Sequence, residues 1–194
     1  SSDNMAGARL ALEYLAALGH RKVATLRAPF SYPGRLRYEA WAEFAAERDG
    51  FRDDYVRDGD FTPESGMAAA AGFAAMRDPP TAIFAASDLM AIGLIRGFEQ
   101  LGVRVPEDVS IVGFDDIPNA ELVGPALTTV AQDTLGIGQA ALDAVLDELD
   151  SGSRRDEILV EPRLVVRRSC AAPRGTTGPL EVGAATARVV SSAP

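Results

Sequence analysis

Residues 81–116 have the sequence TAIFAASDLMAIGLIRGFEQLGVRVPEDVSIVGFDD, and this stretch decides the fold. Thr81 to Ala85 is a short apolar run of the kind found in buried strands. Ser87-Asp88 is a typical start for the helix that follows, and Gly102 is a typical end. Val109 to Phe114 is a second buried strand. A strand, a helix and a strand in this order predict two parallel strands joined by a helical crossover.

The same alternation continues on both sides of this unit. It predicts an α/β protein with a doubly wound parallel sheet, covered by helices on both faces in a three-layer α/β/α arrangement. The predicted strands cover residues 22–27, 55–57, 81–85, 109–114, 128–131 and 158–166, and the predicted helices cover residues 5–18, 37–48, 62–76, 88–101 and 135–149. We expect Asn4 to cap the first helix.

Polar side chains collect where the predicted strands end. In an open α/β sheet, ligands bind beyond the carboxyl ends of the strands. Carboxylates and amides exchange hydrogen bonds with paired hydroxyls, an arginine donates in a rigid fork, and an aromatic ring covers the apolar face of a sugar. Carboxylates, an amide, an arginine and an aromatic ring together therefore suit a polyhydroxylated ligand. The predicted ligand-binding residues are Arg37, Phe61, Ser87, Asp88, Asp115 and Gln132.

Each of these residues also has a purely structural interpretation. Ser87 and Asp88 are good helix caps. Asp115 and its neighbour could form a solvated turn, and Phe61 could pack only on the helix that it precedes. Arg35 and Arg37 lie together at the start of a helix, so we expect at least one of them to face solvent.

Composition narrows the class of function. A net charge of −9 over 194 residues opposes binding of this segment to nucleic acid or to an anionic membrane. His20 and Cys170 are the single residues of their types, which argues against a multi-histidine metal site or an internal disulfide and fits a reducing cytoplasm. The sequence lacks the nucleophile-elbow, phosphate-loop, zinc and dinucleotide motifs. We expect no catalytic residue, metal or cofactor, and neither a membrane span nor a secretory signal is predicted.

Four stretches, in the same order, resemble the lac repressor/galactose repressor (LacI/GalR) family of bacterial transcription regulators. They are EYLAALGHRKVA (13–24), FAASDLMAIG (84–93), LGVRVPEDVSIVGFDD (101–116) and PALTTVAQ (125–132), and the resemblance covers residues 3 to about 170. It implies a lobe like those of type I periplasmic binding proteins. It also implies a cytoplasmic homodimer that binds a small effector, and operator DNA bound through a separate helix-turn-helix head.

The resemblance also assigns roles to single residues. Arg37 resembles the arginine that grips the effector, and Phe61 resembles the aromatic residue that packs on it. Asp115 and Gln132 match ligand contacts of the family, and Ser87 stands where many members carry Asn.

The family pattern divides the chain into parts. Residues 21–129 and 156–168 correspond to the second, effector-binding lobe, whereas residues 1–20 and 130–155 correspond to remnant helices of the first lobe. Residues 169–194 are expected to form a flexible tail, with a weak strand at Val189-Val190. The DNA-reading head and most of the first lobe have no counterpart here. The two remnant helices would lack their sheet, so we expect exposed apolar surface on them. Helix 88–101 is apolar nearly all round, and in the family this region helps to form the dimer.

Two other functions stay open. A periplasmic sugar-binding protein of a transport system has a similar fold, and the upstream sequence would separate it from a regulator. An enzyme acting on sugars could use the adjacent carboxylates of Asp115 and Asp116, but neighbours in sequence rarely face one bond from opposite sides. The function predicted from the sequence is therefore effector sensing without chemistry, coupled to DNA affinity.

Overall fold

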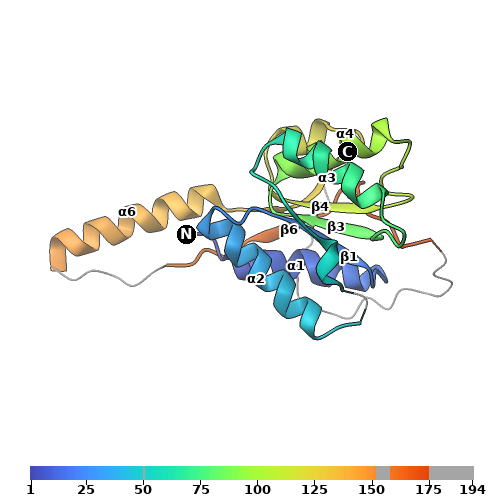
Figure 1. Ribbon diagram of the computed structural model, residues 1–194. Coiled ribbons are helices and arrows are strands. Elements are labelled where there is room, and N and C mark those ends of the chain that lie inside the picture. Colours follow the sequence, from blue (N-terminus) through green and yellow to red (C-terminus); the bar gives the residue numbers. More distant parts are fainter. Residues whose placement is uncertain (50, 152–157, 175–194) are drawn as a thin grey trace.

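The computed structural model describes residues 1–49, 51–151 and 158–174 (Figure 1). At its centre is a six-stranded sheet in the order β2-β1-β3-β4-β5-β6. The strands are β1 (Val23–Arg27), β2 (Val56–Asp58), β3 (Ala82–Ala85), β4 (Ser110–Asp115), β5 (Thr128–Ala131) and β6 (Arg163–Val165). The helices are α1 (Asn4–Ala17), α2 (Tyr32–Ala46), α3 (Pro63–Ala74), α4 (Asp88–Gln100), α5 (Asn119–Leu122) and α6 (Thr134–Ser151), and a 3₁₀ turn covers Asp53–Tyr55.

The sheet is mixed rather than wholly parallel. Strands β1 to β5 pair in parallel, as the sequence predicts. The last strand is a correction, because β6 runs antiparallel to β5, with Ala131 opposite Arg163. The chain leaves the carboxyl end of β5 into α6 and returns to the sheet from the same side, so β6 runs back along β5 (Figure 1). It is also shorter than the predicted strand over residues 158–166.

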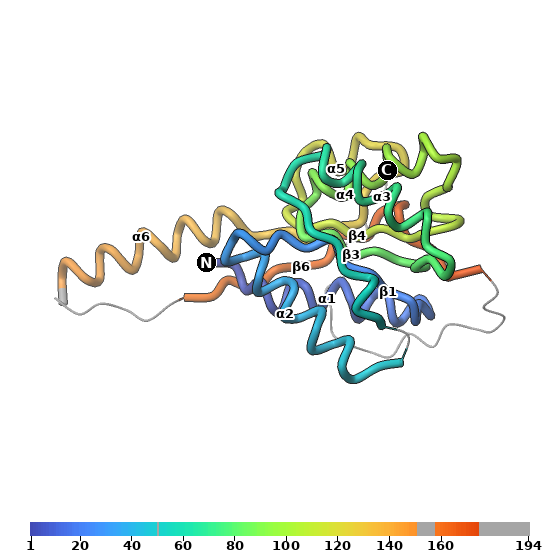
Figure 2. The backbone as a smooth tube through the Cα atoms, in the orientation of Figure 1, coloured from blue at the N-terminus to red at the C-terminus, as the bar shows by residue number. Residues whose placement is uncertain are grey.

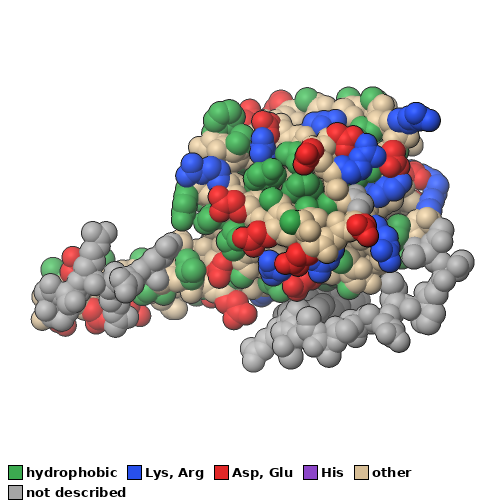
Figure 3. All heavy atoms as spheres, turned by 60° about the horizontal axis from the view of Figure 1, so that its bottom comes forward, with side chains coloured by type: hydrophobic (Ala, Val, Ile, Leu, Met, Phe, Trp, Pro, Cys, Tyr) green, Lys and Arg blue, Asp and Glu red, His purple; other side chains and the backbone are tan. Residues whose placement is uncertain are grey.

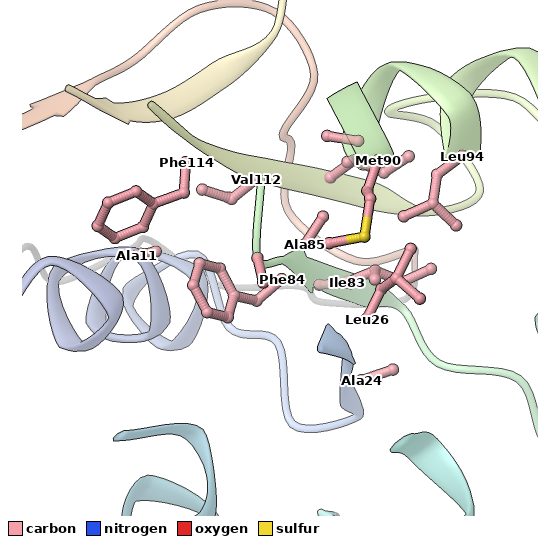
Figure 4. Close-up of a cluster of buried hydrophobic side chains, with 14 of the residues drawn as sticks. Ala11, Ala24, Leu26, Ile83, Phe84, Ala85, Met90, Leu94, Val112 and Phe114 are labelled. Atoms are coloured by element: carbon pink, nitrogen blue, oxygen red, sulfur yellow. The ribbon is translucent and has the colours of Figure 1, made fainter. Parts of the chain in front are cut away.

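Helices cover both faces of the sheet. Helices α1 and α2 lie on one face, and α3 and α4 lie on the other (Figures 1 and 2). Because side chains alternate along a strand, Phe84 and Phe114 point toward α1, whereas Ile83 points toward Met90 and Leu94 of α4 (Figure 4). All five side chains are fully buried. The sheet therefore has an apolar core on each face, as a three-layer fold requires.

Helix α1 packs on this sheet. Its apolar stripe, made by Ala8, Ala11, Leu12 and Leu15, is fully buried against α2 and the strands. The family pattern predicts that residues 1–20 are a remnant helix of the first lobe, and in this structure α1 lies against α2 and against strands β3, β5 and β6. The apolar spacing shows which face of a helix is buried, but it does not say which sheet that face meets.

Helix α6 has the opposite character. It stands away from the body of the molecule (Figures 1 and 2). Its exposed large apolar side chains are Leu135, Leu142, Val145, Leu146 and Leu149. This is the exposed apolar surface that the sequence predicts for the second remnant helix.

Two helix starts differ from the predicted ones. Asp3, rather than Asn4, caps α1, and its carboxylate accepts a hydrogen bond from the backbone N–H of Ala6 at 2.9 Å. Helix α2 begins at Tyr32 instead of residue 37, because the Ser31 side chain caps it and a proline occupies its first turn.

The segment after β6 is anchored to the sheet at its start. Ser169 is fully buried, and its hydroxyl donates to the carbonyl of Ile111 at 2.6 Å. The flexible tail predicted for residues 169–194 therefore does not begin at residue 169. The greater part of it, residues 175–194 with the Val189-Val190 strand, lies outside the described residues.

The surface is mixed in charge. On the face turned forward in Figure 3, acidic and basic side chains are interspersed with apolar ones. Ion pairs also bridge neighbouring elements, such as Arg9 of α1 with Glu43 of α2 at 3.4 Å. None of the described helices has both the length and the apolar character needed to cross a membrane.

Candidate functional site

Three of the predicted site residues meet at the carboxyl edge of the sheet. Arg37 comes from the second turn of α2, Asp115 ends β4, and Gln132 follows β5. Nη1 of Arg37 lies 3.3 Å from Oδ1 of Asp115, and Nε2 of Gln132 donates to the same oxygen at 2.7 Å. The parallel topology explains the meeting, because it brings the ends of β4 and β5 and the helix after β1 to one edge.

Arg37 is held by more partners than Asp115. Its Nε donates to Oδ1 of Asn4 at 2.8 Å, and its Nη1 donates to the carbonyl of Ala86 at 2.6 Å. The side chain is buried, and burial lowers the pKa of the guanidinium, opposed by the charge of Asp115. Sequence reasoning missed Asn4, because a polar residue at the start of a helix gives only the signal of a cap.

Asp115 is the carboxylate of the cluster formed by Arg37, Asp115 and Gln132, and 29% of its side chain is exposed. Partial burial raises its pKa, whereas the neighbouring Arg37 charge and the Gln132 amide lower it. The backbone of Asp115 has φ 121° and that of Asp116 has φ 56°, a region that residues with side chains seldom adopt. This bend at the strand end places a carboxylate at the edge, where it is open to solvent.

Ser87 and Asp88 lie beneath this edge. The Ser87 hydroxyl caps α4 by accepting from the backbone N–H of Met90 at 3.3 Å. The Asp88 carboxylate is fully buried and accepts hydrogen bonds from the backbone N–H of Ile117, at 2.9 Å, and from the hydroxyl of Thr129. Burial raises the pKa of Asp88 to about 7. These contacts favour the structural interpretation of both residues over direct ligand contact.

Phe61 lies at the far end of the same edge. It follows β2, has φ 67° and packs half-buried against the core. Strands β1 and β3 separate β2 from β4. Phe61 and Asp115 are thus three strand spacings apart, roughly 14 Å, so one ligand meets both only if it lies along the edge.

The chain's single histidine and single cysteine lie apart from this cluster. His20 is buried, with Nδ1 2.9 Å from the Thr81 hydroxyl and Nε2 2.9 Å from the carbonyl of Ala171. Burial lowers the pKa of His20 to about 4 and raises the pKa of Cys170 to about 12. Within the described part of the chain, no three His, Cys, Asp or Glu side chains gather in a way that suits a metal ion.

The fold and this edge match a known family. Residues 12–170 match the family described as periplasmic binding protein-like domain. The chain therefore belongs to this family, in the group formed by the LacI/GalR transcription regulators.

Two relatives that are similar in sequence are transcriptional repressors. The chain is 36% identical over 173 residues to the HTH-type transcriptional repressor PurR of Serratia proteamaculans, covering 87% of this chain and 51% of that protein. It is 39% identical over 170 residues to the PurR repressor of Edwardsiella ictaluri, covering 85% of this chain and 49% of that protein. The chain thus spans about half the length of the curated relatives it matches.

Two solved structures of similar fold are also of transcription regulators. The transcriptional regulator CelR in its cellobiose complex superposes with a TM-score of 0.79 at 35% identity, over 87% of this chain and 52% of that one. A dimeric Lac repressor with an 11-residue C-terminal deletion gives a TM-score of 0.80 at 32% identity, over 89% of this chain and 64% of that one.

Proposed function

We propose that this chain is the effector-sensing part of a LacI-type transcription regulator, and that it binds a small polar molecule, with a sugar as the first candidate, without performing chemistry on it. The observation that carries the proposal is the cluster of Arg37, Asp115 and Gln132 at the carboxyl edge of the sheet. The names of the relatives and of the solved structures support regulation rather than transport.

The cluster suits a ligand that donates hydrogen bonds. The Asp115 carboxylate is an acceptor with about four lone-pair sites, and Arg37 and Gln132 reach it through one oxygen only. Arg37 is already bound to Ala86 and Asn4, so its role is to fix and to neutralise the carboxylate. A hydroxyl or N–H group of a bound molecule fits the accessible side of Asp115.

Coupling to DNA would come from other parts of the protein. We infer a cytoplasmic homodimer in which a helix-turn-helix head contacts operator DNA, because the PurR relatives are HTH-type repressors and a Lac repressor dimer is known bound to operator. The net charge of −9 on this chain is consistent with a separate DNA-binding part. A first lobe that packs on the exposed leucines of α6 would complete the effector cleft, and effector binding would then shift the population of dimer geometries.

Calorimetry with a defined panel tests the proposal. The protein expressed from its complete reading frame is titrated with glucose, galactose, ribose, lactose, cellobiose, guanine, hypoxanthine and adenosine. We expect saturable binding of at least one compound, with no product detected by chromatography. Asp115→Asn should weaken that binding by about tenfold or more, since a hydrogen bond to a charged group contributes about 1.5–3 kcal/mol.

Asp108→Asn is the matched control. Asp108 is also an aspartate paired with arginine, but its partners Arg104 and Arg174 are both more than half exposed. We expect the Asp108→Asn variant to bind the same compound with the affinity of the parent. Absence of binding by every panel compound would count against the effector-sensing proposal, and release of a product would favour an enzyme.

A further inference from the structure

The turn that presents Asp115 has a strained backbone. Asp115 and Asp116 are successive non-glycine residues with positive φ, at 121° and 56°. Such a backbone conformation is strained for a residue with a side chain and persists only where its surroundings fix the backbone. Groups outside the turn must therefore hold it in place.

Asp88 holds the turn from beneath. Its Oδ2 accepts the backbone N–H of Ile117, the residue directly after the strained pair, and its Oδ1 accepts the hydroxyl of Thr129 on β5. The carboxylate is packed under β4, where a Cβ atom added to Gly113 would lie 2.2 Å from Oδ1. The exit of the strand is thus tied to α4 and to β5 at once.

Arg167 holds the turn from the side of β6. Its Nη2 donates to Oδ1 of Asp116 at 2.7 Å, and its Nη1 donates to the carbonyl of Leu127 at 2.9 Å. The backbone N–H of Arg167 donates to the hydroxyl of Thr128 at 2.9 Å. The ion pair is largely shielded, with 12% of the arginine and 20% of the aspartate side chain exposed. The second strained residue therefore has its own fixed partner.

We propose that Asp88 and Arg167 are positioning residues for effector binding, which hold the turn over residues 115–117 so that Asp115 presents its carboxylate to the ligand. Neither residue touches the ligand in this proposal. The inference rests on the proposed function, and it moves Asp88 from the predicted ligand contacts to the support beneath them. Arg167 is added to the site, although the sequence gives no sign of it.

The test separates positioning from simple stability. Arg167→Met and Asp88→Asn are made in the protein expressed from its complete reading frame, and the probe is the panel compound that binds the parent most tightly. Calorimetry gives the dissociation constant and the fraction of binding-competent molecules separately. We expect the dissociation constant of both variants to rise about tenfold with a stoichiometry near that of the parent. A lower stoichiometry with an unchanged dissociation constant would show a purely structural role and overturn the proposal.

A double variant shows whether Arg167 acts through Asp115. If it does, Arg167→Met combined with Asp115→Asn binds as weakly as Asp115→Asn alone, whereas additive losses would overturn the proposal. Arg104→Met is the matched control, because it removes an exposed Arg–Asp ion pair elsewhere, and its affinity should stay within twofold of the parent. Arg167→Lys keeps the charge and should recover part of the affinity.

A ligand-free measurement covers the case in which no panel compound binds the parent. That result would count against the proposed function, but the turn can still be observed by hydrogen exchange at the backbone amide of Ile117. We expect exchange at least tenfold faster in Asp88→Asn and Arg167→Met than in the parent and in Arg104→Met. Unchanged exchange in both variants would overturn the positioning role by itself.

Discussion

The guanidinium of Arg37 stacks on the ring of Phe114, with its central carbon 3.6 Å from the ring centroid. The ring of Phe114 is buried on the α1 side of the sheet (Figure 4). The arginine is therefore covered by an aromatic face while polar groups of Asn4, Ala86 and Asp115 meet its edge. A planar fork of donors is the side-chain shape that satisfies both demands.

Arg37→Lys tests this arrangement. A lysine keeps the charge, but its ammonium is a point donor that cannot bridge Asn4 and Asp115 while lying flat on a ring. We expect a loss of about 2–4 kcal/mol in the free energy of unfolding, because buried acceptors lose their partner. Effector binding should weaken at least tenfold. Urea unfolding and calorimetry measure the two effects.

Arg35→Lys is the internal control for Arg37→Lys. Arg35 lies two residues earlier on α2 and is exposed, so its stability change should stay within about 0.5 kcal/mol. If Arg35→Lys weakened effector binding and Arg37→Lys did not, Arg35 rather than Arg37 would be the arginine that supports the effector site.

Much of the fold follows from local patterns in the sequence. Strands β1, β3, β4 and β5 are largely apolar runs of the kind found in buried strands, and the helices between them carry apolar stripes. The short strand β2 is Val-Arg-Asp, and its positions are not buried. The antiparallel direction of β6 could not be predicted, because it depends on the path of the chain around α6. The early start of α2 could have been predicted from the sequence, since Ser31 followed by Pro33 is typical of a helix cap with a proline in the first turn.

The sequence predicts the members of the site only where the strand topology alone determines which side chains meet. Asp115 and Gln132 meet because the carboxyl ends of neighbouring parallel strands share one edge. Asp88 follows a strand as well, yet its carboxylate turns inward to Thr129 and to the space left by Gly113. Those partners are distant in sequence, so the residue type and its position could not reveal the inward orientation.

Two buried groups should give opposite dependences of stability on pH. Asp88 has a folded pKa of about 7 against an ordinary value of 3.8, so its contribution is present below pH 4 and is lost as the pH rises to 7. His20 has a folded pKa of about 4 against 6.5, so its contribution is present above pH 6.5 and is lost as the pH falls to 4. Between pH 4 and 6.5 the two effects oppose each other.

Single variants should expose each dependence in urea unfolding at several pH values. Relative to the parent, Asp88→Asn should lose stability as the pH falls from 6.5 to 4, because His20 then acts unopposed. His20→Gln should lose stability as the pH rises from 4 to 7. The limiting slope for either group is about 1.4 kcal/mol per pH unit. Parallel pH profiles for the parent and both variants would contradict these assignments.

Helices α3 and α4 approach closely through glycine, and Gly93→Ala tests that contact. A Cβ atom at Gly93 would lie 2.1 Å from the carbonyl oxygen of Pro63, a backbone atom that cannot rotate away. We expect a loss of about 1–3 kcal/mol or more in chemical denaturation, as for an overpacked core. Gly138→Ala is the matched substitution in α6, where nothing lies within 4 Å, and it should raise helix content slightly. Equal effects of the two substitutions would show that the close approach does not limit packing.

The two helices that the sequence groups together, α1 and α6, should respond differently to the same truncation. Leu12 of α1 is fully buried, so Leu12→Ala should lower the free energy of unfolding by about 2–5 kcal/mol. Leu149 of α6 is 77% exposed, so Leu149→Ala should change it by less than about 0.5 kcal/mol in this chain. In the protein expressed from its complete reading frame, the same Leu149→Ala should become destabilising if a first lobe covers α6. A small effect of Leu149→Ala there would mean that α6 stays uncovered, and the proposed two-lobed cleft would lose its support.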